Sequence, residues 1–254
     1  MRIVIKIGTS TLAHPTRHLN IRLVEQLCKV VSDIKNAGHE VIVVSSGAIG
    51  MGVGKLGLLK RPQDIPTKQA AAAVGQCELM YTYDKLFGEY NHTVAQLLIT
   101  GADVANTTRH ENFKNTLNRL LELGALPIIN ENDTVATEEI VIGDNDTLAA
   151  IVAKSVQAQL LVLLSDIDGL YTADPHKDPN AQLISHISQI TDAVRSLGGG
   201  SSTSQGTGGM ATKLHAAEIC MDCGCDMIIT NGKRPEDLYA ILDGKAVGTT
   251  FSRR

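Results

Sequence analysis

The sequence has no tryptophan, only three phenylalanines and five tyrosines, so aromatic residues make up 3% of its 254 positions. It also lacks a block of positive charge: 23 lysines and arginines are interspersed with 27 aspartates and glutamates, and the formal net charge is -4. Surfaces that bind nucleic acid are usually basic, and single strands stack on aromatic rings. We therefore expect no nucleic-acid partner.

No apolar run is long enough to span a bilayer, and the sequence opens with a strand-like segment, residues 1–8, instead of a signal peptide. The five cysteines form an odd set without the spacing of a disulfide framework. We therefore expect reduced thiols, a cytoplasmic location and no membrane partner. The spacing of Cys220, Cys223 and Cys225 would also allow a zinc site, but no fourth ligand follows at zinc-ribbon spacing, and we expect these cysteines to pack in the core.

Hydrophobic residues make up 43% of the chain, enough for one large α/β domain or two small ones. Apolar, β-branched runs alternate with helical patterns, which predicts a mainly parallel sheet covered by helices. We expect strands at 3–7, 41–44, 94–99, 127–129, 160–164, 227–229 and 247–251, and helices at 20–37, 67–87, 112–123, 146–157, 210–223 and after Pro235. No repeat or linker divides the chain, so we predict a single domain, 1–254, with lobes of about 1–150 and 151–254.

A glycine- and hydroxyl-rich segment, residues 198–213, runs into the helix expected at 210–223. It places Lys213 within about the first turn of that helix. A cation there is unfavourable by roughly 0.3–1 kcal/mol unless an anion lies beside it. Glycine loops at helix starts can present backbone N–H groups to phosphate. The segment thus predicts a phosphate site that is not a Walker A motif, although a flexible loop with a solvated lysine would have the same composition.

Other polar residues follow the ends of expected strands. Lys6 ends the first strand and predicts an anion, unless its side chain reaches the surface instead. Ser46 and the glycines that follow it are consistent with an anion-binding loop. Ser165 and Asp166 begin a segment that reads either as a hairpin connection or as a nucleotide-edge loop.

Two clusters of Asn and acidic residues, at 130–133 and 143–146, flank a hairpin or extended flap expected at 134–142. Helix capping explains such residues at a helix start and remains an alternative. Asn and Asp can also hold an ammonium group or orient lysines. Two clusters so close together therefore predict an amino-acid site.

Together these segments resemble the amino acid kinase family, and within it the members that phosphorylate glutamate. The resemblance covers nearly the whole chain and rests on KIGTS at 6–10, SSGAIGMG at 45–52, KQAAAAVGQ at 68–76, NENDTVA at 130–136, GDNDTLAA at 143–150, SDIDGLYTADP at 165–175 and GTGGMATKLHAAE at 206–218. It implies a three-layer α-β-α sandwich. It also implies that the ATP γ-phosphoryl group is transferred, with Mg²⁺, to the side-chain carboxylate of L-glutamate, giving L-glutamyl 5-phosphate in the first step of proline biosynthesis.

The resemblance also implies roles for individual residues. Lys6, Lys213 and Asp146 would be catalytic, with Asp144 a weaker candidate for the network that orients the lysines, and Ser46, Asp133 and Asn145 would bind glutamate. The implied ATP site consists of Lys6, Ser165, Asp166, Thr207, Gly208, Gly209, Met210, Ala211, Thr212 and Lys213. No residue is assigned to a metal. L-Proline is implied as a feedback inhibitor, and we expect a homo-oligomer, a dimer or a tetramer.

The chemistry of the residues agrees with this reaction. A carboxylate acceptor with a pKa of about 4.3 is already ionised and needs no general base. Two lysines, Mg²⁺ and backbone N–H groups can compensate the charge that gathers in the transition state.

Two other functions stay open at this point. One is an enzyme of the same family with another acceptor, such as carbamate, aspartate, N-acetylglutamate or a nucleoside monophosphate. A nucleotide acceptor would need an arginine near 46–52, and the nearest one, Arg61, lies beyond a run of glycines. The other is a catalytically silent sensor, against which the presence of both lysines argues. Many family members carry a further C-terminal RNA-binding-type (PUA) domain, whereas this sequence ends at Arg254, so we expect a short form with catalysis intact.

Overall fold

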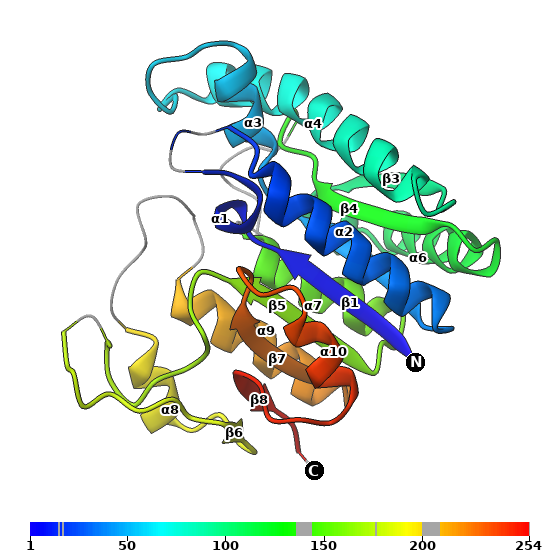
Figure 1. The fold of residues 1–254 in the computed structure, drawn as a ribbon. Helices are drawn as coiled ribbons and strands as arrows, with labels where there is room; N and C mark the ends of the chain where they lie inside the picture. Colours follow the sequence, from blue (N-terminus) through cyan, green and yellow to red (C-terminus); the bar gives the residue numbers. More distant parts are fainter. Residues whose placement is uncertain (15, 17, 136–143, 176, 200–208, 254) are drawn as a thin grey trace.

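The computed structural model describes residues 1–14, 16, 18–135, 144–175, 177–199 and 209–253. Its centre is an eight-stranded sheet in the order β3-β4-β2-β1-β5-β7-β8-β6 (Figure 1). From β3 to β7 in this order, each pair of neighbouring strands is parallel, while β8 runs antiparallel to β7. The strands are β1 Arg2–Ile7, β2 Glu40–Ser45, β3 Val94–Ile99, β4 Leu126–Glu131, β5 Leu160–Ser165, β6 His186–Ile187, β7 Asp226–Asn231 and β8 Thr249–Phe251.

Two hydrophobic cores cover the two faces of the sheet, and this makes the molecule a three-layer α-β-α sandwich. Because side chains alternate along a strand, Ile3, Ile5 and Ile7 of β1 pack in the core with α2 and α4. Val4 instead packs in the other core, with α6, α7 and α9. Lys6 shares the face of Val4, so its side chain points toward the layer that holds α7 and α9.

The helices confirm most of the expected elements. They are α1 Thr9–Leu12, α2 Ile21–Asn36, α3 Ala48–Lys55, α4 Ile65–Gly88, α5 Gly101–Ala105, α6 Thr107–Glu122, α7 Asn145–Ser155, α8 Asp192–Leu197, α9 Met210–Asp222 and α10 Asp237–Leu242. Asn20 caps α2 as expected, by accepting a hydrogen bond from the backbone N–H of Leu23. The elements that the sequence did not predict are mostly short: α1, α5, α8 and β6. The flap expected at 134–142 lies largely outside the described residues.

The expectation of a glycine loop after the second strand was only partly right. Gly47 adopts a left-handed conformation at the end of β2 with φ 102°, but α3 begins directly after it. The glycines of α3 serve packing: a Cβ on Gly52 would lie 1.8 Å from the carbonyl oxygen of Ala71, and one on Gly75 would lie 1.7 Å from that of Ala48. Helices α3 and α4 therefore cross at backbone contact, and this contact outweighs the low helix propensity of glycine.

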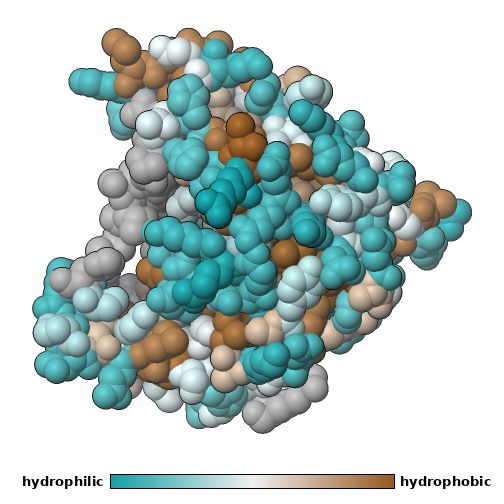
Figure 2. Space-filling view, in the orientation of Figure 1, coloured by the Kyte–Doolittle hydropathy of each residue, from teal (hydrophilic) through white to brown (hydrophobic). Residues whose placement is uncertain are grey.

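The alanine run in α4 takes part in the same packing. Ala71 and Ala72 are buried inside the chain, as expected for a core helix, whereas Ala70 and Ala73 are exposed. The face shown in Figure 2 is mostly hydrophilic, with hydrophobic side chains in small separate groups. Among the described residues, no helix combines the length and the hydropathy that a membrane span requires.

Candidate active site

The polar residues singled out in the sequence gather at one edge of the sheet. Lys6, Ser45, Asn130 and Ser165 lie at the carboxyl ends of β1, β2, β4 and β5. β1 lies between β2 and β5, so the chain leaves it on one side for β2 and reaches β5 on the other. In an open parallel sheet, ligands bind in the crevice at the carboxyl ends of neighbouring strands whose connections run to opposite sides.

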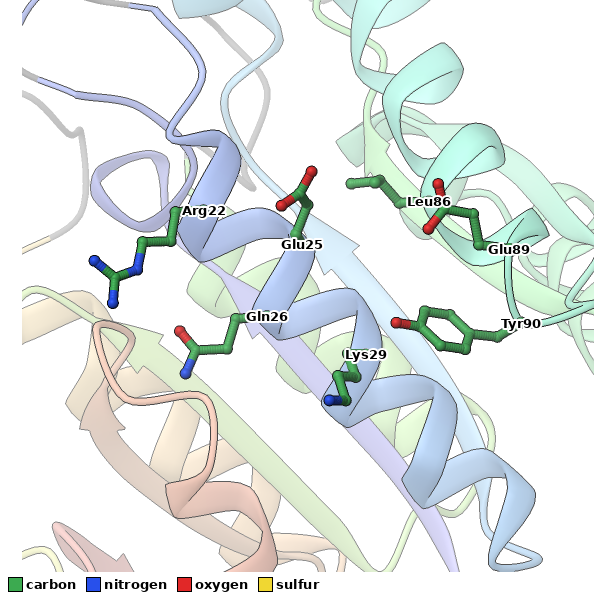
Figure 3. A pocket seen from close by; sticks show the side chains of 7 residues that line it. All are labelled: Arg22, Glu25, Gln26, Lys29, Leu86, Glu89 and Tyr90. Atoms are coloured by element: carbon green, nitrogen blue, oxygen red, sulfur yellow. The ribbon is translucent and has the colours of Figure 1, made fainter.

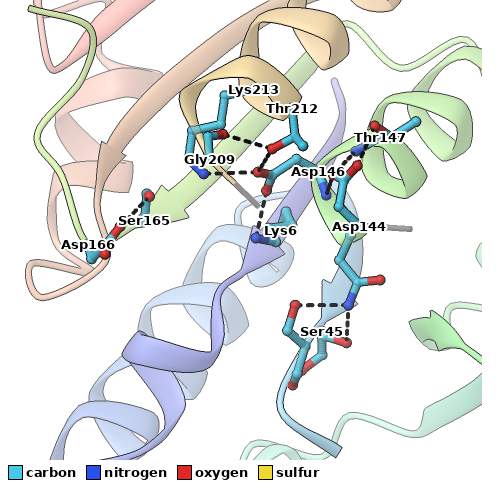
Figure 4. Close-up of polar contacts among 12 residues, drawn as sticks. Lys6, Ser45, Asp144, Asp146, Thr147, Ser165, Asp166, Gly209, Thr212 and Lys213 are labelled. Carbon is cyan, nitrogen blue, oxygen red and sulfur yellow. Dashed lines mark hydrogen bonds and ion pairs between the residues drawn. The ribbon is translucent and has the colours of Figure 1, made fainter. Parts of the chain in front are cut away.

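Lys6 and Lys213 meet on one carboxylate. The Nζ of Lys6 lies 2.6 Å from Oδ1 of Asp146, and the Nζ of Lys213 lies 2.9 Å from Oδ2 (Figure 4). The hydroxyl of Thr212 donates to the same Oδ2 at 3.2 Å. The anion that the position of Lys213 predicts is thus Asp146, on a different helix and 67 residues away. Neither lysine is solvated, since Lys6 is 9% exposed and Lys213 is 6% exposed.

The electrostatics of this cluster favour a bound anion. Burial raises the pKa of Asp146, but the charges and hydrogen bonds of Lys6 and Lys213 outweigh it and hold the pKa at about 2. Asp146 is 1% exposed, so two lysines and one carboxylate leave a net positive charge in a place with little water. Uncompensated buried charge is costly. A phosphoryl group at this position would balance it.

Asp144 orders the start of α7. Its Oδ1 accepts hydrogen bonds from the backbone N–H groups of Asp146 and Thr147, and its Oδ2 accepts one from the hydroxyl of Thr147. These bonds make Asp144 the N-cap of α7 (Figure 4). Capping thus explains this member of the 143–146 cluster, and Asp144 supports the lysine network only through the position of Asp146.

Asn145, next along the chain, reaches the end of β2. Its Nδ2 donates to the hydroxyl of Ser46 at 2.8 Å, to the carbonyl oxygen of Ser45 at 3.3 Å and to Oδ1 of Asn130 at 3.0 Å. The structure therefore brings Ser46 and Asn145, two of the three predicted glutamate-binding residues, into contact. Asn130 joins them, although sequence reasoning assigned it only to a polar cluster.

The same end of the site is acidic. Burial, together with the nearby Asp133 and Asp144, raises the pKa of Glu131 to about 7. Burial also raises the pKa of Asp133, against the opposing effect of Arg61. Arg61, the nearest arginine to 46–52 in the sequence, follows α3 and lies close enough to Asp133 to oppose this rise.

The residues expected to bind ATP lie on the other side of the lysine pair. Ser165 is buried at the end of β5 and donates to the exposed Asp166. Gly209 is the N-cap residue of α9, whose first turn contains Met210, Ala211 and Thr212 and no acidic residue. No side chain among the described residues caps this helix start, and N–H groups at such a position can bind an anion. Thr207 and Gly208 lie outside the described residues.

Three other features lie outside this site: possible metal ligands, the cysteines and a groove. No group of three or more His, Cys, Asp or Glu residues among those described is arranged to hold a metal ion. Cys28, Cys220 and Cys225 are buried, while Cys77 and Cys223 are exposed, so the expected packing in the core is confirmed for Cys220 and Cys225 and is wrong for Cys223. A groove of about 440 Å³ lies between α2 and the end of α4, lined by charged side chains, Leu86 and Tyr90 (Figure 3). It shares no residue with the site at the sheet edge.

Comparisons with known proteins bear on the family to which this chain belongs. The amino acid kinase family model matches residues 1–231. A glutamate 5-kinase of Listeria innocua is 52% identical over 100% of this chain and 93% of that protein, and one of Clostridium tetani is 50% identical over 98% and 94%. A glutamate 5-kinase of Caldanaerobacter subterraneus is 49% identical over 99% of this chain and 68% of that protein.

Solved structures with the same fold are more distant in sequence. A carbamate kinase from Giardia lamblia bound to AMP-PNP has a TM-score of 0.70 at 18% identity, covering 100% of this chain and 98% of that one. An isopentenyl phosphate kinase of T. acidophilum has a TM-score of 0.67 at 19% identity, covering 99% and 100%. The family model and the sequence relatives show that the chain belongs to the amino acid kinase family and, within it, to the glutamate 5-kinases.

Proposed function

We propose that this chain transfers the γ-phosphoryl group of ATP to the side-chain carboxylate of L-glutamate, giving L-glutamyl 5-phosphate, and so begins proline biosynthesis. The observation that carries the proposal is the lysine pair on Asp146, between an acidic acceptor end and the start of α9, which no described side chain caps. Both reactants are anions. The buried positive charge lies where they would meet.

The acceptor would lie among Ser46, Asp133 and Asn145. Its α-ammonium group would face the acidic end that Asp133 and Glu131 form, where burial and mutual repulsion already disfavour uncompensated negative charge. Its side-chain carboxylate would then point toward Lys6 and Lys213. Because this carboxylate is ionised at neutral pH, the site needs charge compensation and alignment rather than a base.

The nucleotide would lie on the other side of the lysines, within residues 151–254. Ser165, Asp166 and the run from Thr207 to Lys213 would hold it, with its phosphates at the start of α9. Both oxygens of Asp146 contact lysines, so this carboxylate has little capacity left for a metal. We therefore place Mg²⁺ on the ATP phosphates, where it would offset their charge. Lys6 and Lys213 would stabilise the transferring group, and Asp146 would orient them.

The proposal extends to control and location. L-Proline carries an α-carboxylate and an amino group like those of glutamate, so it would compete for the acceptor end, and the enzyme would act as a dimer or a tetramer. A cytoplasmic location is in keeping with the five cysteines, all within the described residues and none in a disulfide.

A direct assay tests the reaction. The purified protein is incubated with ATP, Mg²⁺, hydroxylamine and one acceptor at a time, and hydroxamate and ADP are measured. We expect the highest kcat/KM with L-glutamate. ADP release above background with carbamate, aspartate, N-acetylglutamate or UMP but not with glutamate would contradict the proposal, and binding of ligands without any ADP would favour a sensor.

A further inference from the structure

A chain of side-chain amides runs from the outer helix layer to the acceptor end of the site. Gln76 lies in α4 and is 7% exposed. Its Oε1 accepts a hydrogen bond from Nδ2 of Asn130 at 2.9 Å. Oδ1 of Asn130 in turn accepts one from Nδ2 of Asn145 at 3.0 Å. These hydrogen-bonded amides thus connect α4, β4 and α7 across the sheet.

Backbone groups show which atom of each amide is the oxygen and which is the nitrogen. The N–H of Glu131 donates to Asn130 at 2.9 Å, so the atom that it meets must be the oxygen, Oδ1. The nitrogen of Asn130 then faces Gln76, which must present Oε1. At the other end the carbonyl oxygen of Ser45 can only accept, so the nitrogen of Asn145 faces it.

One atom at each end of the chain is buried without a partner among the described residues: Nε2 of Gln76 and Oδ1 of Asn145. Buried polar atoms rarely remain unpaired in a folded protein. Oδ1 of Asn145 can only accept, and it belongs to a residue in contact with Ser46. It is therefore suited to a ligand that brings a donor, such as an ammonium group.

We propose that Gln76 is a positioning residue for the acceptor site. By accepting the hydrogen bond from Nδ2 of Asn130, it holds Oδ1 of Asn130 toward Asn145, and this keeps Oδ1 of Asn145 free to accept from the α-ammonium group of the substrate. The inference rests on the proposed role of Asn145 in binding the acceptor. Gln76 itself does not touch the substrate and acts only through Asn130 and Asn145.

The first test replaces Gln76 with residues of similar size. Gln76→Met removes the acceptor and leaves Nδ2 of Asn130 unpaired, so we expect the KM for glutamate to rise about tenfold or more. The kcat and the KM for ATP should stay within about threefold. Burial favours the neutral form of a carboxyl, so Gln76→Glu still presents an oxygen to Asn130 and should restore most of the affinity.

A double mutant tests whether Gln76 acts through Asn145. In an Asn145→Ala background, Gln76→Met should change the KM for glutamate by less than about twofold, because the residue through which it acts is gone. Thr82→Val is the matched control, since it removes a buried hydroxyl of α4 whose one hydrogen bond among the described residues stays within the helix, to the carbonyl oxygen of Glu78. It should leave the kinetic constants unchanged.

Three results would overturn the inference: an unchanged KM in Gln76→Met, a similar rise in the KM values of glutamate and ATP, or full additivity with Asn145→Ala. Gln76→Leu repeats the test if Gln76→Met does not fold. The parent protein is first assayed on the acceptor panel given above. If another acceptor is preferred, the proposed function fails, and the same variants measured with that acceptor still test Gln76.

Discussion

At the residue scale, the contact of Lys6 and Lys213 with one carboxylate explains how two cations can be buried beside each other. Each lysine pairs with its own oxygen of Asp146, and burial of the cluster makes the remaining positive charge effective. A charge held in place in this way acts on the transferring phosphoryl group without reorganisation. Its removal should therefore affect catalysis more than binding.

Lys213→Ala should lower kcat by about 10²–10³, the usual cost of losing one such donor, and should change the KM for glutamate much less. Steady-state kinetics at varied glutamate and ATP measure both constants. Lys154→Ala, which removes an exposed lysine from the last turn of α7, is the control and should behave like the parent. A Lys213→Ala enzyme within a few-fold of the parent kcat would remove Lys213 from the mechanism.

Glu131 gives a prediction about pH and stability. Its pKa in the folded protein is about 7, above the ordinary 4.5, so the folded state favours the protonated form. The stabilisation linked to that proton is complete below about pH 4.5 and is lost as the pH rises through about 7. Glu131→Gln should remove this pH-dependent loss of stability, because glutamine does not ionise. Its Tm should therefore rise relative to the parent between about pH 5 and about pH 8.

Thermal unfolding at several pH values measures this difference. For a domain of this size, about 1 kcal/mol corresponds to about 2–4 °C in Tm. The exposed Glu89 supplies the control, since Glu89→Gln should give a Tm difference that does not vary with pH. A constant difference for Glu131→Gln as well would mean that Glu131 is ionised over the whole range.

At the scale of elements, the crossing of α3 and α4 sets the position of the β2 end. A methyl group on Gly75 would lie 1.7 Å from the carbonyl oxygen of Ala48, which is backbone and cannot move alone. Gly75→Ala should therefore force the helices apart and destabilise the protein by about 1–3 kcal/mol. Because Ser46 lies just before α3, the KM for glutamate should rise as well.

Gly88→Ala is the matched control, because it is the same change in the same helix and nothing lies within 4 Å of the added Cβ. It should be neutral or should stabilise by up to about 1 kcal/mol. Urea unfolding compares the two variants. Equal stabilities would show that the α3–α4 contact can relax without cost.

At the scale of the whole molecule, the residues proposed to hold the amino acid all lie before residue 150, in the lobe that would also bind proline. We expect L-proline at millimolar concentration to inhibit competitively with glutamate and to leave the KM for ATP unchanged. Rates at subsaturating and saturating glutamate measure this, with N-acetyl-L-proline, which lacks the charged nitrogen, as the control. Inhibition that saturating glutamate does not relieve would place the proline site elsewhere.

The sequence by itself determined the layers of this molecule and the edge where the site lies. Apolar periodicity predicted the strands from β1 to β5 and the longer helices between them, α2, α4, α6 and α7. The sequence also predicted that Lys213 needs an anion, because a helix dipole is a local property of the chain. These features depend on residues a few positions apart.

Tertiary structure decided which groups meet. The anion beside Lys213 is 67 residues away, Gln76 and Asn130 are 54 residues apart, and no local pattern relates the members of either pair. The glycines of 47–54 read as a loop because their propensity opposes a helix, yet contact with α4 makes most of them helical. Arg61 and Asp133, 72 residues apart, also come within electrostatic reach of each other. Packing between distant segments, which the sequence does not display, brought these residues together.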